Sequence, residues 1–187
     1  MLRGMTSCGA NSKILTPRLS VSFFHKIVSF FVFSPHSHHS SPLSKKNSYG
    51  IVQFSTIGSL FMPLAASNVT FMTTLDTMKQ FVMGTNTWAG CHTVRQEFLA
   101  HSRPSAFKAL VILTDGEWNQ GPSPLNETAA MKKEGVHIFT VAVGEASTPN
   151  VQALASTPLS KYYFNVTTEL QLPSILHKMV GAMCTRD

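Results

Sequence analysis

Two long apolar runs in the second half of the chain constrain the fold more than any other feature. In "KALVILTDGEWNQG", residues 108–121, an unbroken run of apolar or β-branched residues stops at Asp115. "VHIFTVAVG", residues 136–144, is apolar in the same way. Because neither run alternates with polar residues, each is typical of a strand buried on both faces of a sheet. Such a strand needs cover on both sides, which predicts an α/β domain.

Helical patterns lie between and after these strands. Apolar residues recur at helical spacing in "TWAGCHTVRQEFLAHS", residues 87–102, and along one face of "LPSILHKMVGAMC", residues 172–184. "SPLNETAAMKKEG", residues 123–135, has a serine for the N-cap, a proline at the first helical position and a glycine past the end. Further strands are predicted in "SYGIVQFST", "NVTFMTTL" and "KYYFNV", residues 48–56, 68–75 and 161–166. The alternation predicts a doubly wound, mostly parallel sheet with helices on both faces.

The N-terminal part of the chain differs in composition from the rest. Its first acidic residue is Asp76, although basic residues begin at Arg3. A short apolar run at residues 27–33 is followed by a stretch rich in Ser, Pro and His. Four interpretations remain open: a secretory signal, a transit peptide, a core strand with an abnormal loop, and plain disorder. We assign residues 1–48 as a poorly ordered segment, a candidate targeting sequence or gene-model artefact, and residues 49–184 as the domain.

Composition excludes several classes of protein. The net charge is +6, but the basic residues form no stripe with interleaved aromatics, which disfavours nucleic-acid binding. The chain has no apolar stretch of about 18 residues, so no membrane span is predicted. Its three cysteines, Cys8, Cys91 and Cys184, fit neither a zinc motif nor a disulfide scaffold.

Asp115 and Thr85 are the candidate site residues. In a doubly wound sheet, ligands bind beyond the carboxyl ends of the strands, and Asp115 follows such an end. A plain Asp-Gly turn is the competing interpretation. In "GTNTWAG", residues 84–90, Thr85 precedes a helix, where a hydroxyl can cap the helix or bind a metal. Hydroxyls and carboxylates are the oxygen ligands that suit Mg²⁺.

The order of these segments, from about residue 49 to residue 184, resembles the von Willebrand factor type A domain, also called the integrin I-type domain. The resemblance implies a three-layer α/β/α fold with a metal-ion-dependent adhesion site (MIDAS). There, three loops hold one Mg²⁺ or Mn²⁺, and an acidic residue of a partner protein completes the coordination. Thr85 matches the second loop and Asp115 the third. The implied function is a non-enzymatic, extracellular or cell-surface module that binds a matrix or cell-surface protein at the carboxyl edge of its sheet.

The first loop of that site departs from the family pattern. Its Asp-x-Ser-x-Ser motif occurs nowhere in the chain. If residues 27–33 are the first strand, Ser34, His36 and His38 stand where the motif belongs. We therefore expect the family's first strand and helix to be missing or degenerate, and Mg²⁺ or Mn²⁺ binding to be weak or absent. A zinc site from His36, His38 and His39 is a less favoured alternative to a flexible polar tail.

Other residues carry secondary expectations. Trp118 is a candidate partner contact, with simple packing as the alternative. Asn68, Asn126 and Asn165 each begin an Asn-x-Thr sequon, so they are candidates for N-glycosylation in a secreted protein. Cys91 occupies an apolar helix position and is expected to be a buried free thiol. The family resemblance implies that Cys184 ties the domain ends together, with Cys8 as its candidate partner.

Two alternative functions remain open. The first is an intracellular scaffold subunit of the same broad family, which glycosylation would exclude. The second is a phosphoryl-transfer enzyme with Asp115 as nucleophile, because "VILTDGE" ends a strand in an aspartate. The second carboxylate and the lysine that such enzymes pair with it are not evident in the sequence.

Overall fold

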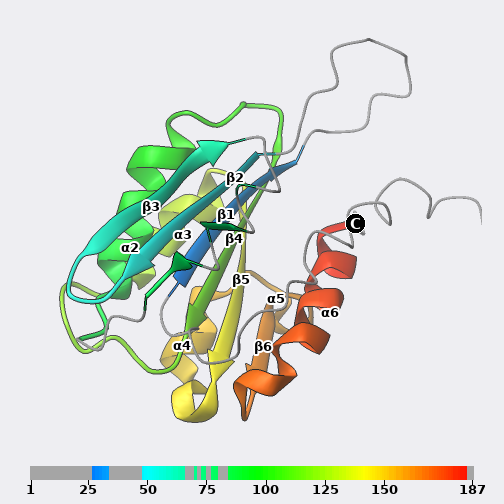
Figure 1. Cartoon of the computed structure of the whole chain (residues 1–187). Coiled ribbons are helices and arrows are strands. Elements are labelled where there is room, and N and C mark those ends of the chain that lie inside the picture. Colours follow the sequence, from blue (N-terminus) through cyan, green and yellow to red (C-terminus); the bar gives the residue numbers. More distant parts are fainter. Residues whose placement is uncertain are drawn as a thin grey trace, which may run out of the picture.

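The computed structural model describes residues 27–33, 48–65, 70, 73–74, 77–79 and 84–184 (Figure 1). One six-stranded sheet contains β1 (Ile27–Phe33), β2 (Ser48–Phe54), β3 (Gly58–Ala65), β4 (Phe107–Thr114), β5 (Val136–Val143) and β6 (Tyr163–Val166). The α-helices are α2 (Thr87–Val94), α3 (Leu125–Lys133), α4 (Pro149–Leu154), α5 (Leu159–Tyr162) and α6 (Leu172–Cys184). A π-helical turn, η2 (Arg95–Leu99), extends α2, and η3 (Gly144–Ala146) and η4 (Glu169–Gln171) are 3₁₀ turns. In the described part of the chain, no helix has both the length and the apolar character needed to cross a bilayer.

The strand order is β3-β2-β1-β4-β5-β6. β4 pairs in parallel with β5, and β5 with β6. β2 runs in the same direction as β4, since both are antiparallel to β1, which lies between them. Helices α2, α3 and α4 cover one face of the sheet and α6 covers the other (Figure 1). This arrangement confirms the predicted three-layer, doubly wound α/β fold. The sheet is mixed rather than mostly parallel, however, because β1 pairs antiparallel with β2 and β4, and β3 pairs antiparallel with β2.

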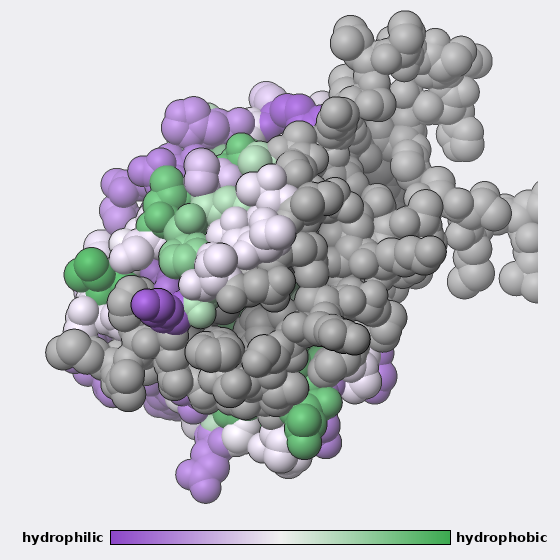
Figure 2. Space-filling model, viewed as in Figure 1, coloured by the Kyte–Doolittle hydropathy of each residue, from purple (hydrophilic) through white to green (hydrophobic). Residues whose placement is uncertain are grey.

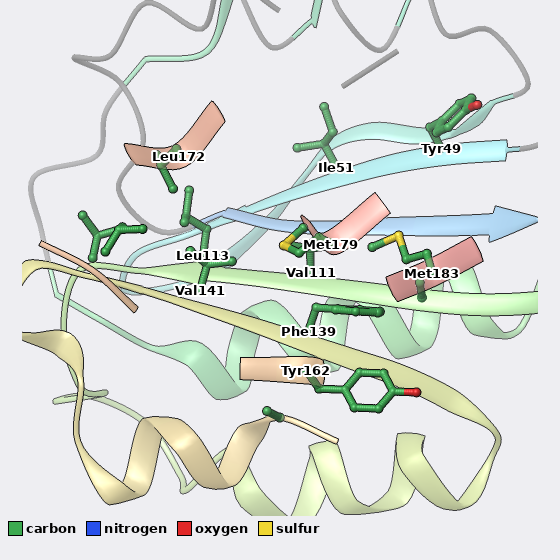
Figure 3. Close-up of a cluster of buried hydrophobic side chains, with 14 of the residues drawn as sticks. Tyr49, Ile51, Val111, Leu113, Phe139, Val141, Tyr162, Leu172, Met179 and Met183 are labelled. Carbon is green, nitrogen blue, oxygen red and sulfur yellow. The ribbon is translucent and has the colours of Figure 1, made fainter. Parts of the chain in front are cut away.

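Side chains of the inner strands contribute to two hydrophobic clusters, one on each face of the sheet. Along β4, Ala109, Val111 and Leu113 face the α6 side, whereas Leu110 and Ile112 face the α2 side. On the α6 side, Met179 and Met183 of that helix join the cluster that the strands form (Figure 3). Successive side chains of a strand point to opposite faces, so both faces of β4 must be apolar. This explains the unbroken apolar run in the sequence.

The central strand β1 runs opposite to both of its neighbours. Its register pairs Ile27 with Leu113 of β4 and with Gln53 of β2, and pairs Phe33 with Phe107 at the start of β4. Of the interpretations left open for residues 27–33, the structure has the strand, in a central position but reversed. The boundary proposed between residues 48 and 49 stays a prediction, although β1 lies on its N-terminal side and belongs to the sheet.

The reversed direction of β1 is compatible with its connection to β2. Antiparallel neighbours can be joined by a loop, whereas parallel neighbours need a crossover of about a dozen residues or more, usually a helix. Residues 34–47, which lie outside the described part of the chain, separate β1 from β2. Their sequence is rich in Ser and Pro, which disfavour a helix, and the antiparallel pairing requires none.

The predicted strand at residues 68–75 is wrong. Its described residues, Thr70, Thr73 and Thr74, are helical, and the strand is instead β3, which precedes them. β-branched threonines favour strands locally, but a threonine hydroxyl can also bond a carbonyl one turn back in a helix. Thr73 and Thr77 do so, donating to the carbonyls of Thr70 and Thr74 at 3.1 and 2.8 Å. β3 was not predicted; its sequence includes Pro63, which an edge strand tolerates because one side of it is unpaired.

Candidate functional site

Three loops meet at the edge of the sheet where β2, β4, β5 and β6 end, called the carboxyl edge below (lower part of Figure 1). Residues 55–57 join β2 to β3, residues 84–86 precede α2, and residues 115–121 follow β4. Thr85 lies in the second of these loops and Asp115 in the third, as predicted. The Thr85 side chain is buried and Asp115 is partly exposed.

Asn119 joins the loops that carry Thr85 and Asp115. The Thr85 backbone N–H donates to Asn119 Oδ1 at 2.8 Å. In return, the Asn119 backbone N–H donates to the Thr85 carbonyl at 3.0 Å. These two bonds, called the Thr85–Asn119 clip below, connect the two loops directly. Sequence analysis did not single out Asn119, because a contact between distant loops leaves no periodic signal.

Asn86 ties the same region to the β2–β3 turn. Its Oδ1 accepts from the N–H of Ala89 at 3.0 Å and caps α2, so the capping group is an amide rather than the predicted hydroxyl. Its Nδ2 donates to the Thr56 carbonyl at 2.9 Å, and its backbone N–H donates to the Ser55 carbonyl at 2.6 Å. One side chain therefore positions both the helix start and the neighbouring turn.

Close packing between the loops depends on a glycine. Gly121 has φ of 73°, in the left-handed region that side chains rarely adopt. A Cβ added there would collide with the Asn86 side chain. The loop after β4 therefore lies directly against the residue that caps α2. The carboxyl edge is a compact, interlocked set of loops.

The oxygen donors in these loops are few. Thr85 offers one hydroxyl and Asp115 one carboxylate, and the next acidic residue, Glu117, accepts from Asn150 Nδ2 at 3.4 Å. In the residues that the structure describes, no three His, Cys, Asp or Glu side chains gather in a way that could hold a metal ion. Mg²⁺ needs about six oxygen ligands, of which several can be water. The described donors alone do not fit a tightly held Mg²⁺.

The residues that would follow β1 in place of the Asp-x-Ser-x-Ser loop are attached at the edge of the sheet opposite Asp115. Ser34, His36 and His38 follow β1, and they lie outside the described residues. Their attachment point, Phe33, pairs with Phe107 at the start of β4. β1 therefore ends at the edge opposite Asp115. Whether Ser34, His36 and His38 stand in the motif's place stays a prediction, because the structure describes only the strand that precedes them.

Two further predicted residues are placed by the structure. Trp118 is partly buried and packs against the cluster on the α2 side, as Leu125 does. Cys91 is fully buried and free, which confirms the prediction of a buried thiol. Burial, together with the nearby negative charge of Glu127, raises the pKa of Cys91 to about 12. Cys8 lies outside the described residues and the Cys184 side chain is not described, so their disulfide stays a prediction.

Comparison with known proteins agrees with the fold. Residues 22–178 match the model of the von Willebrand factor type A domain. The collagen alpha-4(VI) chain of Mus musculus is 26% identical over 142 residues, which cover 74% of this chain but 6% of that protein.

Solved structures of proximal thread matrix protein 1 from the mussel byssus also resemble the chain. One, described with a zinc-occupied MIDAS motif, has 26% identity and a TM-score of 0.64, covering 71% of this chain and 34% of that one. Another structure of the same protein has 25% identity and the same TM-score of 0.64. The chain thus spans about a third of that protein's length. Since the family model covers most of the sequence and agrees with the strand order, the chain belongs to the von Willebrand factor type A domain family.

Proposed function

We propose that this chain is a non-enzymatic protein-binding module whose carboxyl edge contacts its partner without relying on a bound divalent cation. The proposal rests on the direction of β1. Because β1 ends at the opposite edge, the loops at the carboxyl edge offer Thr85 and Asp115 but no Asp-x-Ser-x-Ser segment. The Thr85–Asn119 clip joins the two loops directly, which supports a carboxyl edge held together by hydrogen bonds. Binding of Mg²⁺ or Mn²⁺ is then weak or absent.

The surface around the loops suits a protein partner recognised by mixed contacts. Among the described residues, the large apolar side chains that are exposed belong to different elements; they are Ile57, Leu60, Leu159 and Leu170. In Figure 2, the hydrophobic residues likewise form small separate groups among hydrophilic ones. Trp118, which lies in the Asp115 loop and is partly buried, is the candidate anchor for such a partner.

The collagen chain and the byssus protein support an extracellular partner, a matrix or cell-surface protein. The alternative, an intracellular scaffold subunit of this family, predicts that all thiols stay reduced and that no sequon is modified. The phosphoryl-transfer alternative has little support from the described residues near Asp115. Glu117, the next carboxylate along the loop, is in contact with Asn150 rather than with a lysine.

Isothermal titration calorimetry of the full chain with Mg²⁺ and with Mn²⁺ tests the metal part of the proposal. We expect no binding at submillimolar concentration, and the same result for Asp115→Ala and Thr85→Ala. Submillimolar binding that Asp115→Ala abolishes would refute the proposal. Phosphatase activity toward a general aryl phosphate, lost in the same Asp115 variant, would instead support the enzyme.

A further inference from the structure

The two edge strands of the sheet differ in how they resist pairing with another chain. β3 carries Pro63 and irregular register against β2, and both features hinder the addition of a further strand. β6 pairs with β5 and has no second neighbour among the described strands. Within β6 there is neither a proline nor a lysine, and its pairing with β5 is regular. Its protection, apart from its short length, must come from elsewhere.

Asn165 of β6 is exposed and begins an Asn-Val-Thr sequon. It pairs in register with Ala142 of β5, so its position on the edge strand is fixed. The threonine of the sequon, Thr167, is exposed too, and its hydroxyl lies 3.2 Å from Gln171 Oε1 at the surface. Both groups that N-glycosylation requires are therefore accessible at the β6 edge.

The sequon at Asn126 is arranged differently. Asn126 is exposed in the first turn of α3, but its threonine, Thr128, is completely buried and donates to the Leu125 carbonyl at 3.1 Å. The residue between them, Glu127, is largely buried and lies 3.3 Å from His92 Nδ1. In the folded chain, the hydroxyl that N-glycosylation requires is therefore inaccessible at this sequon.

We propose that Asn165, and not Asn126, accepts an N-linked glycan, and that this glycan covers the β6 edge of the sheet. In the transfer, Asn165 Nδ2 bonds to the anomeric carbon of a lipid-pyrophosphate-linked oligosaccharide. The bond from that carbon to the pyrophosphate oxygen breaks, the lipid pyrophosphate leaves, and the amide proton passes to solvent. A glycan is bulky and well hydrated, so it excludes a strand of a second copy from the space beside β6. The modification rests on the extracellular location proposed above.

Site occupancy can be measured directly on the full chain, secreted from cultured animal cells behind an added leader. An Asn68→Gln background removes the third sequon from the measurement. After treatment with peptide N-glycosidase, which converts a glycosylated asparagine to aspartate, peptide mass spectrometry should find the conversion at Asn165 and not at Asn126. Thr167→Ser should keep the modification and Thr167→Ala should lose it. Conversion at Asn126 with none at Asn165 would overturn the assignment.

Sedimentation velocity tests the role of the glycan at the edge. The glycosylated chain should sediment as a monomer, and the same material after enzymatic removal of the glycan should self-associate at micromolar concentration. Unchanged sedimentation after glycan removal would contradict edge protection. The chain without the added leader separates this inference from the proposed location. Its appearance in the medium would support the extracellular location by itself, and the result at Asn165 in the leader-directed chain is read independently of it.

Discussion

Replacement of Asn119 by alanine tests whether the Thr85–Asn119 clip holds the carboxyl edge together. The change removes the acceptor of the Thr85 N–H, now bonded at 2.8 Å, but keeps the backbone bond from Asn119 to the Thr85 carbonyl. Thr85 is 5% exposed, so its N–H has poor access to water. The variant therefore leaves one nearly buried donor without its partner.

The expected loss can be estimated from that donor. A buried N–H without an acceptor costs about 1–3 kcal/mol. Because Asn119 itself is exposed, water can enter part of the space that its side chain leaves, which favours a loss of about 1–2 kcal/mol. For a domain of this size, such a loss lowers the melting temperature by roughly 2–8 °C.

Urea unfolding followed by circular dichroism measures the change as a lower midpoint at unchanged slope. Hydrogen exchange should show faster exchange of the Thr85 amide in the variant. Asn150→Ala is the matched control, because Asn150 is exposed and its Nδ2 donates to Glu117 Oε2 at 3.4 Å at the surface. We expect the free energy of unfolding of this variant to stay within about 0.5 kcal/mol of the wild type. If Asn119→Ala matches this control in both measurements, the clip does not stabilise the two loops.

Three more substitutions or measurements test other parts of the structure. Gly121→Ala should destabilise the fold by about 1–3 kcal/mol more than Gly144→Ala, since both glycines have positive φ but only at Gly121 would the new methyl collide with Asn86; equal urea midpoints would contradict the packing. Phe30→Pro should cost at least about 3 kcal/mol, because Phe30 pairs with both β2 and β4; a variant as stable as the wild type would place this segment outside the sheet. Cys91 should resist thiol reagents until unfolding, as peptide mapping can show. Because its folded pKa is raised from 9.0 to about 12, stability should fall as pH rises above 9, by up to about 1.4 kcal/mol per pH unit; no decline would contradict burial.

Sequence reasoning predicted the elements whose patterns are determined by burial alone. β4 and β5 are apolar on both faces because they lie inside a covered sheet, and α6 is apolar along one face because the sheet covers that face. The position of Asp115 at a strand end followed from the same pattern. The segment at residues 68–75 was misassigned because local propensity favours a strand, while its described threonines take part in hydrogen bonds within a helix.

The direction of β1 could not be predicted from its residues. "IVSFFVF" is apolar almost throughout, so it presents similar side chains to both faces whichever way it runs. A pattern of this kind specifies burial but neither direction nor register. The direction depends instead on the connection to β2, since antiparallel strands, unlike parallel strands, need no crossover between them.

The direction of β1, which the sequence left open, also affects which side chains lie at the carboxyl edge. If β1 ran parallel to β4, the residues after Phe33 would emerge beside Asp115, and the histidines there could contribute nitrogen ligands suited to zinc. In the antiparallel arrangement, Phe33 lies beside Phe107 instead, at the far end of β4. Asp115 then shares its edge with Thr85 and with an asparagine that holds the loops by hydrogen bonds. Under the proposed function, a protein partner would be recognised by the shape and hydrogen-bonding groups of these interlocked loops, and their rigidity would limit the entropy lost on binding.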